Sequence, residues 1–348
     1  MAKKILITPL SWGIGHATRC IPIIKELLSL NHTLIIASDG DALKLLQKEF
    51  PNLEFITLPA YNIKYSKKSF FLPFYLFLQV PRLLNVIKKE KKKIKAIVTE
   101  RQIDIILNDN RFGCYHKDIK TIYITHQINV LSGVFSFLTT KIHQNIIKKM
   151  DICWVPDTTN SKLTGKLSTS DLTNVYFTGI LSRFKKPRIL PKKKYAILVL
   201  LSGIETQRVA LEKKLLKELA PLNKKILFVR GVLSDKGKIK NTKHITFVNY
   251  LLESELQDAI LQSDVVIARS GYSTIMDLAV LQKKCFFIPT PNQKEQEYLA
   301  KRMEKLQIAA YCKQRFFTLQ KLEKITDYKG FTTFEVKSNL QKLILDQL

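Results

Sequence analysis

Short apolar runs alternate along the chain with longer stretches in which apolar residues recur at helical spacing. This alternation predicts parallel strands covered by helices. In the first half of the chain we predict strands at residues 5–8, 33–37, 54–58, 103–107, 121–125, 152–155 and 175–177. The helical stretches between them are residues 17–30, 42–49 and 140–150.

A second series follows a break rich in lysine and proline at residues 183–194. Its predicted strands are residues 195–201, 225–229, 244–247, 265–268 and 285–288, with helices near 205–220, 253–262, 273–281 and 294–306. The pattern therefore predicts an α/β protein with two doubly wound, Rossmann-like domains, 1–183 and 184–330. A short amphipathic helix at 336–345 is expected in the tail, 331–348.

Composition supports a folded protein of two domains, since 46% of the 348 residues are hydrophobic. The net charge of +28 indicates an acidic partner, either nucleic acid, anionic lipid or a phosphorylated small molecule, or else compositional drift. Residues 1–183 hold 26 basic and 13 acidic residues and the remainder 31 and 16, so the excess is general and favours drift. No recognition helix or RNP-like aromatic pair is visible, so nucleic-acid binding is the least favoured class.

The cysteines and the N-terminus indicate a cytoplasmic location. The five cysteines are scattered, without a C-x-x-C pair or a zinc-like cluster, which favours a reducing compartment and no structural metal. The first apolar run is too short for a signal peptide, and no run reaches the roughly 18 residues of a membrane-spanning helix.

The loop after the first predicted strand contains Gly13-Ile14-Gly15-His16 and leads into a helix. Ligands of open parallel sheets bind outside the carboxyl ends of the strands, and a helix N-terminus favours negative charge. The loop is not a dinucleotide fingerprint, because Thr18 stands where the third glycine belongs, although Asp39 could supply the acidic residue of such a site. His16 is suited to proton transfer near neutral pH. A purely structural turn remains equally open.

A second loop follows the strand at 265–268. Ser270-Gly271 ends that strand, Ser273 and Thr274 open a helix, and Asp277 lies one turn further on. Such a loop forms an anion cradle suited to a pyrophosphate, with a carboxylate placed for ribose hydroxyls. The alternative is that these hydroxyls only cap the helix and that Asp277 lies on a solvated face.

These motifs, together with Pro289-x-x-x-Gln293-x-Glu295-Gln296, resemble glycosyltransferase family 28. The family has the GT-B fold, in which two Rossmann-like domains face each other across a cleft. It includes the N-acetylglucosaminyltransferase that acts on the lipid intermediate of peptidoglycan. Ile14 stands where the family usually has a second glycine before the histidine, so the loop is more similar to uncharacterised relatives than to that enzyme.

The resemblance implies a nucleotide-sugar donor, usually UDP-linked, in the second domain, and it implies a role for each motif residue. Asp277 would bind the ribose, Gln293 and Gln296 the sugar, and 229–231 and 249–251 would flank the base. The implied phosphate and loop contacts are Gly13, Gly15, Arg183, Ser202, Gly203, Ser270, Gly271, Ser273 and Thr274.

Inverting transfer requires a base for the acceptor hydroxyl and N–H groups or positive charge for the departing diphosphate. His16 is the candidate base. Asp109 and His126, at neighbouring strand ends, are rivals, although a carboxylate could instead orient His16, and His126 is better suited to a structural or acceptor-binding role. We expect no metal requirement. A nucleotide-sugar hydrolase or epimerase is the alternative enzyme class.

Residues 64–95 contain ten Lys or Arg and one acid, Glu90. The apolar aromatic run 70–78 precedes Val80, Leu83, Leu84 and Ile87 at helical spacing. This composition suits a helix in the interface of an anionic membrane, or equally a core helix with a lysine-rich exposed face. Since the family receives a lipid-linked acceptor on its first domain, we expect peripheral contact with the inner face of the cytoplasmic membrane.

Overall fold

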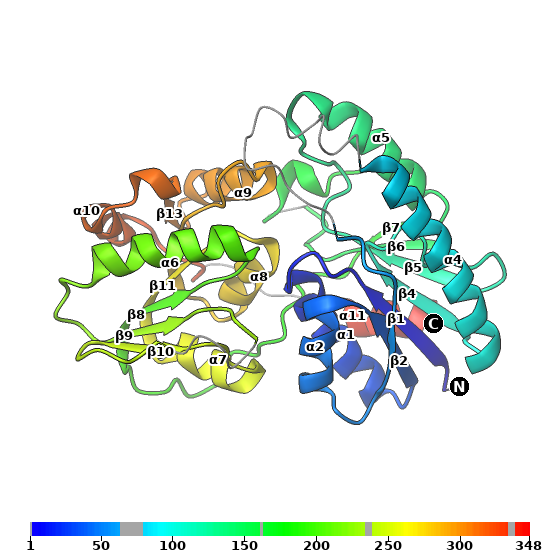
Figure 1. The fold of residues 1–348 in the computed structure, drawn as a ribbon, viewed down its shortest axis with the longest axis horizontal. Coiled ribbons are helices and arrows are strands. Elements are labelled where there is room, and N and C mark those ends of the chain that lie inside the picture. The colour runs from blue at the N-terminus through cyan, green and yellow to red at the C-terminus, as the bar shows by residue number, and fades with distance from the viewer. Residues whose placement is uncertain (1, 63–78, 161–162, 234–238, 333–337) are drawn as a thin grey trace.

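A computed structural model describes residues 2–62, 79–160, 163–233, 239–332 and 338–348. Figure 1 shows two lobes, each a sheet covered by helices. The first sheet is parallel throughout, in the order β3-β2-β1-β4-β5-β6-β7. Its strands are β1 (Lys4–Pro9), β2 (Thr33–Ser38), β3 (Glu54–Thr57), β4 (Ile105–Asp109), β5 (Lys120–Ile124), β6 (Ile152–Val155) and β7 (Val175–Phe177). Its helices are α1 (Gly15–Ser29), α2 (Gly40–Glu49), α4 (Val80–Arg101) and α5 (Ser136–Ile147).

The second sheet is also parallel, in the order β10-β9-β8-β11-β12-β13. Its strands are β8 (Tyr195–Leu200), β9 (Ile226–Val229), β10 (Ile245–Val248), β11 (Ser263–Ala268), β12 (Lys284–Phe287) and β13 (Ala310–Tyr311). Its helices are α6 (Glu205–Leu219), α7 (Glu253–Leu261), α8 (Tyr272–Val280), α9 (Lys294–Lys305) and α10 (Leu319–Glu323). The predicted α/β class with two Rossmann-like sheets is confirmed.

Each sheet has a switch point where strands distant in sequence lie side by side. In the first sheet β1 pairs with β4, which sets Pro9 beside Asp109. In the second, β8 pairs with β11, which sets Leu200 beside Ala268. Chain connections leave such strand pairs in opposite directions, and the crevice between them is where open sheets bind ligands.

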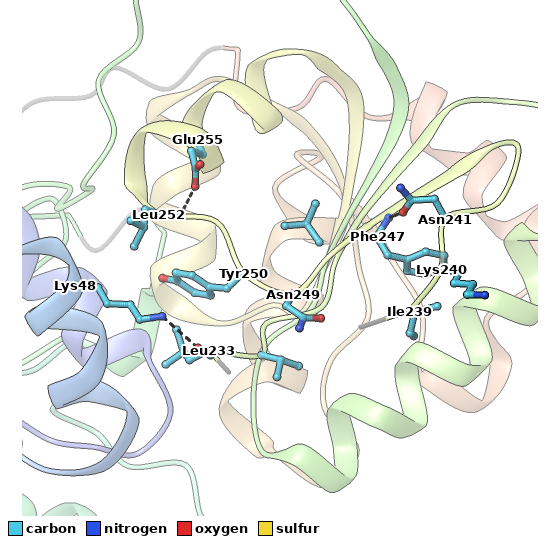
Figure 2. Close-up of a pocket in the computed structure, with 12 residues that line it drawn as sticks. Lys48, Leu233, Ile239, Lys240, Asn241, Phe247, Asn249, Tyr250, Leu252 and Glu255 are labelled. Atoms are coloured by element: carbon cyan, nitrogen blue, oxygen red, sulfur yellow. Dashed lines mark hydrogen bonds between the residues drawn. The ribbon is translucent and has the colours of Figure 1, made fainter. Parts of the chain in front are cut away.

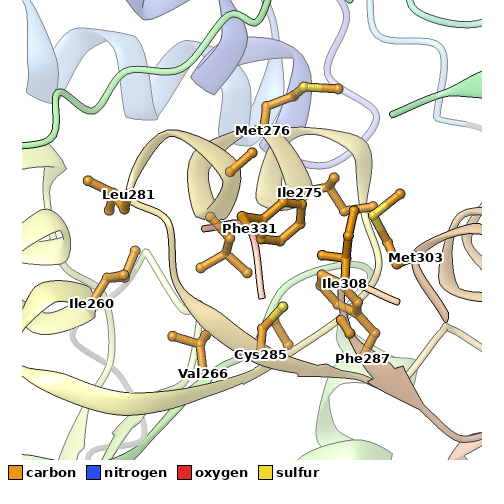
Figure 3. Packing of buried hydrophobic residues seen from close by; sticks show 14 of the residues in the cluster. Ile260, Val266, Ile275, Met276, Leu281, Cys285, Phe287, Met303, Ile308 and Phe331 are labelled. Carbon is orange, nitrogen blue, oxygen red and sulfur yellow. The ribbon is translucent and has the colours of Figure 1, made fainter. Parts of the chain in front are cut away.

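The core of the second domain supports α8 from below. Ile275 and Met276 on this helix are fully buried, and they pack in one cluster with Val266 of β11 and Phe287 of β12 (Figure 3). Phe331, which follows the last strand, is also fully buried in this cluster. Burying side chains of this size contributes about 1.5–3 kcal/mol each to the stability of the fold. The packing therefore holds α8, and the loop at its start, in place.

The tail returns to the first domain. Leu340 and Ile344 of α11 (Leu340–Gln347) are buried in the same cluster as α1, and Trp154 Nε1 donates a hydrogen bond to Gln347 Oε1 at 2.7 Å. The predicted helix 336–345 thus begins at Leu340 among the described residues. The predicted apolar run at 70–78 lies outside them.

Candidate active site

The loops after β1 and β4 bring His16 and Asp109 into contact. Asp109 ends β4 and is fully buried, and its Oδ1 lies 2.7 Å from His16 Nδ1. In the tautomer in which Nδ1–H donates to this carboxylate, His16 Nε2 keeps its lone pair and can accept a proton. The two residues named from strand ends are therefore neighbours, with the carboxylate placed to orient the imidazole.

Sequence reasoning missed Arg19, which completes this cluster. Its guanidinium donates to both carboxylate oxygens of Asp109, with 2.5 Å between Nε and Oδ2. Arg19 Nη2 also lies 2.8 Å from His16 Nδ1. Arg19 can only donate, so this contact is not a hydrogen bond in the tautomer whose Nδ1–H donates to Asp109. The signal was present in the sequence, because residues three apart on a helix share a face and Arg19 follows His16 by three.

Burial is the largest influence on these titrating groups. Burial alone would raise the pKa of Asp109, but Arg19 and His16 favour the carboxylate and hold that pKa well below its ordinary value. Burial lowers the pKa of His16 below 6.5, and Asp109 only partly opposes this because Arg19 acts in the other direction. Asp109 is therefore a carboxylate and His16 a neutral imidazole at neutral pH.

His126 lies where the two domains meet. Its Nδ1 contacts Arg19 Nη1, and its Nε2 is 2.9 Å from Oε1 of Glu295 on α9. Its ring stacks on Tyr272, the first residue of α8, with ring centroids 4.1 Å apart. Glu295 belongs to the predicted motif without an assigned role, and nothing in the sequence indicated that it would pair across the domains.

The predicted anion-binding loop of the second domain, residues 270–277, which we call the donor motif after its predicted role, is held by its own hydroxyl groups. Ser273 Oγ donates to the carbonyl oxygen of Gly15 at 2.9 Å, which joins the start of α8 to the start of α1. Ser270 Oγ donates to the carbonyl oxygen of Gln296 at 2.8 Å, and Gln296 Oε1 accepts from Thr290 N at 2.8 Å. The two predicted loops thus form one assembly beside the His16 cluster.

Asp277 and Arg183 are brought together beneath this assembly. Asp277 Oδ1 accepts a hydrogen bond from Ser182 Oγ at 2.6 Å, and its Oδ2 lies 3.5 Å from Arg183 Nε. Burial raises the pKa of Asp277 above its ordinary value, although Arg183 opposes this. Arg183 Nη1 is buried without a hydrogen-bond partner of normal geometry among the described residues, while, against the effect of burial, Asp277 and Tyr250 nearby raise the pKa of the guanidinium.

The other predicted loop residues are more open. Gly203 follows β8 with a φ of +97°, and no heavy atom lies within 4 Å of where its Cβ would be, so the backbone there is accessible. The same holds for Gly13, whose φ is +81°. Ser202 and Thr274 are half-buried, whereas Gln293 is exposed.

A cavity of about 550 Å³ lies at the carboxyl ends of β9 and β10 (Figure 2). Asn249 and Tyr250, which the sequence places near a nucleobase, line it, and Arg230 supports its wall by donating to Asn249 Oδ1 at 2.9 Å. Lys48 of α2 reaches over from the first domain and donates to the carbonyl oxygen of Leu233 at 3.2 Å. The cavity therefore has walls from both domains.

A second buried ionic cluster closes the end of β2. Arg111 is fully buried and pairs with Asp39 at 2.5 Å and with Glu90 of α4 at 2.7 Å. Asp39 is thus engaged within the first domain. It also begins an Asp-Gly-Asp sequence, but Asp41 is exposed and its nearest cation is Lys44 at 3.9 Å. Among the described residues, no group of three or more His, Cys, Asp or Glu side chains is arranged to hold a metal ion.

No helix in the described part of the chain has the length and apolar character needed to cross a membrane. The described remainder of the segment 64–95 belongs to α4, in which Val86 and Ile94 are buried while Val80 and Leu84 are exposed. This helix therefore packs on the sheet by one face only.

Comparison with known proteins gives a family match in the second domain. Residues 204–329 match the glycosyltransferase family 28 C-terminal domain. An uncharacterized glycosyltransferase of Methanosarcina acetivorans is 23% identical over 327 residues, covering 84% of this chain and 81% of that protein. The UDP-N-acetylglucosamine--N-acetylmuramyl-(pentapeptide) pyrophosphoryl-undecaprenol N-acetylglucosamine transferase of Prochlorococcus marinus is 24% identical over 313 residues, covering 84% and 77%.

Solved structures share the fold over the whole chain. The spinosyn rhamnosyltransferase SpnG superposes with a TM-score of 0.65 at 13% identity, covering 99% of each chain. Its complex with thymidine diphosphate gives a TM-score of 0.62 at 12% identity, covering 94% of this chain and 93% of that one.

Proposed function

Because the chain is a glycosyltransferase of GT-B fold whose second domain belongs to glycosyltransferase family 28, we propose that it transfers a hexose or N-acetylhexosamine from a UDP-linked donor to a lipid-linked or cell-envelope acceptor, with inversion. One observation carries this proposal. The Ser273 hydroxyl of the donor motif donates to the Gly15 carbonyl, so the donor motif and the His16–Asp109 pair meet at one place.

The chemistry follows from the placement of charge. His16 Nε2 removes the proton from the acceptor hydroxyl while Asp109 stabilises the imidazolium that forms, and the oxygen attacks the anomeric carbon from the face opposite the diphosphate. Negative charge then grows on the departing diphosphate. Backbone N–H groups at the start of α8 and the guanidinium of Arg183 are the groups that stabilise it. No step in this scheme needs a metal ion.

The donor assignment rests on the second domain. The cavity lined by Asn249 and Tyr250 has room for a nucleobase, and Asp277 is a carboxylate near the interdomain segment, suited to ribose hydroxyls. The Prochlorococcus relative is named for a UDP-N-acetylglucosamine donor, and the rhamnosyltransferase was solved with thymidine diphosphate. Both ligands contain a pyrimidine nucleoside diphosphate, which supports a UDP-linked donor here.

We test this assignment with calorimetry of the full-length protein against UDP, dTDP, GDP and ADP and their common sugar conjugates. UDP or a UDP-sugar is expected to bind most tightly, with a dissociation constant at least about tenfold below that of ADP, which corresponds to 1.4 kcal/mol. Tighter binding of a purine nucleotide contradicts the donor proposal. Release of free sugar without any acceptor, at the rate of transfer, identifies a hydrolase instead.

The acceptor side is proposed to contact an anionic membrane. The segment Gly133–Phe135 and α5 expose a run of large apolar side chains, with Val134 93% and Phe137 73% exposed. Phe135, Leu138 and Ile142 extend this surface. Residues 133–150 include three lysines and no acid, a composition that suits an anionic lipid interface.

Vesicle flotation tests the membrane proposal. The protein is expected to float with phosphatidylglycerol vesicles and not with phosphatidylcholine vesicles, and the double variant Val134→Ser, Phe137→Ser is expected to stay at the bottom of the gradient. Failure of the unmodified protein to bind either vesicle removes the membrane from the proposal while leaving the transfer reaction intact.

A further inference from the structure

The contacts around His126 join groups that otherwise belong to separate domains. His126 follows β5 of the first domain, and it touches Arg19 on one side and Glu295 and Tyr272 of the second domain on the other. We propose that His126 is a positioning residue that couples the donor-binding loops to the His16–Asp109 pair through Arg19. This inference rests on the proposed glycosyl transfer. It concerns how the donor-binding loops and the His16–Asp109 pair are aligned with each other.

The hydrogen bonds fix how the ring must be protonated. Arg19 can only donate, so the His126 Nδ1 that faces its Nη1 must be an acceptor without a hydrogen. The single ring hydrogen of neutral His126 is then on Nε2, where it donates to Glu295 Oε1 at 2.9 Å. A ring of the opposite tautomer would present N–H to N–H at Arg19 and a lone pair to a carboxylate, and both contacts would be lost.

Glu295 is suited to be the acceptor at the far end. Burial alone would raise its pKa, but the hydrogen bond from His126 and, at longer range, the charge of Arg19 lower that pKa below its ordinary value. Glu295 is therefore a carboxylate near neutral pH. Its neighbour Gln296 holds both Ser270 and Thr290, so the carboxylate is part of the loop that the donor motif fixes.

These contacts form one continuous series from Glu295 through His126 and Arg19 to Asp109 and His16. The guanidinium of Arg19 has one nitrogen on His126 and two on Asp109, so its orientation depends on both. A planar guanidinium makes such contacts in a fixed geometry. Displacing Glu295 therefore reorients Arg19, and with it the carboxylate that aligns the base.

Four variants test the series. His126→Phe keeps a ring against Tyr272 but removes both nitrogens, and we expect kcat to fall about tenfold to a hundredfold while the donor KM changes less than about threefold, as for misaligned catalytic groups. Glu295→Ala is expected to act in the same way, and the double variant is expected to lose no more than either single one. His126→Gln, which restores an acceptor and a donor, is expected to recover most of kcat.

The matched control is Tyr298→Phe. Tyr298 Oη accepts a hydrogen bond from Lys166 N at 3.0 Å, so this variant also removes one hydrogen bond between the domains, but outside the series. We expect its kcat and donor KM to stay within about twofold of those of the unmodified protein. An equal loss in Tyr298→Phe and His126→Phe would reduce the effect to general weakening of the interface and overturn the proposal.

A second readout needs no turnover. Imidazole nitrogen NMR of the full-length protein is expected to show His126 with its hydrogen on Nε2 and to detect a shift of the His16 resonances when UDP binds. In Glu295→Ala, UDP is expected to bind with little change in affinity but to leave His16 unshifted. Absence of UDP binding to the unmodified protein contradicts the donor proposal, whereas an unaltered His16 response in the variant contradicts the series.

Discussion

The loops that follow β1 and β4 in the first domain differ in chemistry from the loops that follow β8 and β11 in the second. At the first crevice, the start of α1 and the end of β4 carry His16, Arg19 and Asp109, which pair with one another. Arg19 and Asp109 are buried and His16 is half-buried. The second set offers glycine backbone and small hydroxyls, such as Gly203 and Ser270. Two crevices of the same topology are therefore equipped for different tasks.

Under the proposed function, the difference divides binding from chemistry between the two crevices. A proton acceptor must be aligned before the reaction, and mutual pairing in a buried cluster achieves that without a ligand. A diphosphate instead needs accessible N–H groups, which glycine and a helix N-terminus supply. If this division is correct, variants in the first crevice change kcat and variants in the second change donor affinity.

The largest effect is expected from His16→Ala. Removing the base should lower kcat by about a hundredfold to ten-thousandfold, since that is the usual contribution of general-base catalysis. The dissociation constant of UDP, measured by calorimetry, should change little because His16 lies outside the donor loops. Turnover close to that of the unmodified protein would mean that another residue is the base. It would also contradict the division of roles between the two crevices.

A smaller effect, on the affinity for UDP rather than on kcat, is expected from Gly203→Ala. A Cβ added at Gly203 would meet no atom within 4 Å, but the φ of +97° is unfavourable for alanine. Holding alanine in this backbone conformation costs about 1–2 kcal/mol. If UDP binding requires that conformation, the affinity should fall about tenfold. Gly133→Ala is the matched control, because Gly133 has a φ of +71°, equally open surroundings and a position away from the donor loops. Equal loss of UDP affinity in both variants would contradict a local role for Gly203.

A moderate shift is expected in the pH dependence of kcat/KM. Since burial lowers the pKa of His16 below 6.5, the active neutral form persists below that pH, and the rate should fall only as the pH drops through the lowered value. Arg19 lowers the pKa of His16 further, so Arg19→Met is expected to move the acidic limb to higher pH. His32→Gln, a change outside the site, should leave the limb in place.

The smallest effect is expected from removing divalent metal. Because the donor crevice is proposed to stabilise the diphosphate with N–H groups and Arg183, treatment with EDTA should leave the initial rate of transfer unchanged. Complete loss of the rate, restored by Mg²⁺, would mean that the second crevice needs a metal ion.

Much of the fold could be predicted because buried parallel strands are compact apolar runs. The GT-B fold and the glycosyltransferase assignment, predicted from the two glycine loops, are confirmed by the comparisons. β13 was missed because a two-residue strand has no detectable pattern. α5 begins at Ser136, before the predicted 140, because Phe137 and Leu138 are exposed and break the expected periodicity.

The site was predictable only within each domain. His16 and Asp109 could be placed together because the ends of adjacent parallel strands meet at one edge of a sheet. The contact between His126 and Glu295 depends on how the two domains pack against each other. A local pattern in the sequence does not predict that packing. The roles of all the candidate residues, from His16 and Asp109 to Gly13, Thr274 and Gln293, stay predictions.

The return of the tail has a mechanical consequence. Phe331 is buried in the second core, whereas Leu340 and Ile344 are buried in the first, so the end of the chain is anchored in the domain where the chain begins. Pulling α11 away from α1 would expose Leu340 and Ile344 as well as the face of α1 that they cover.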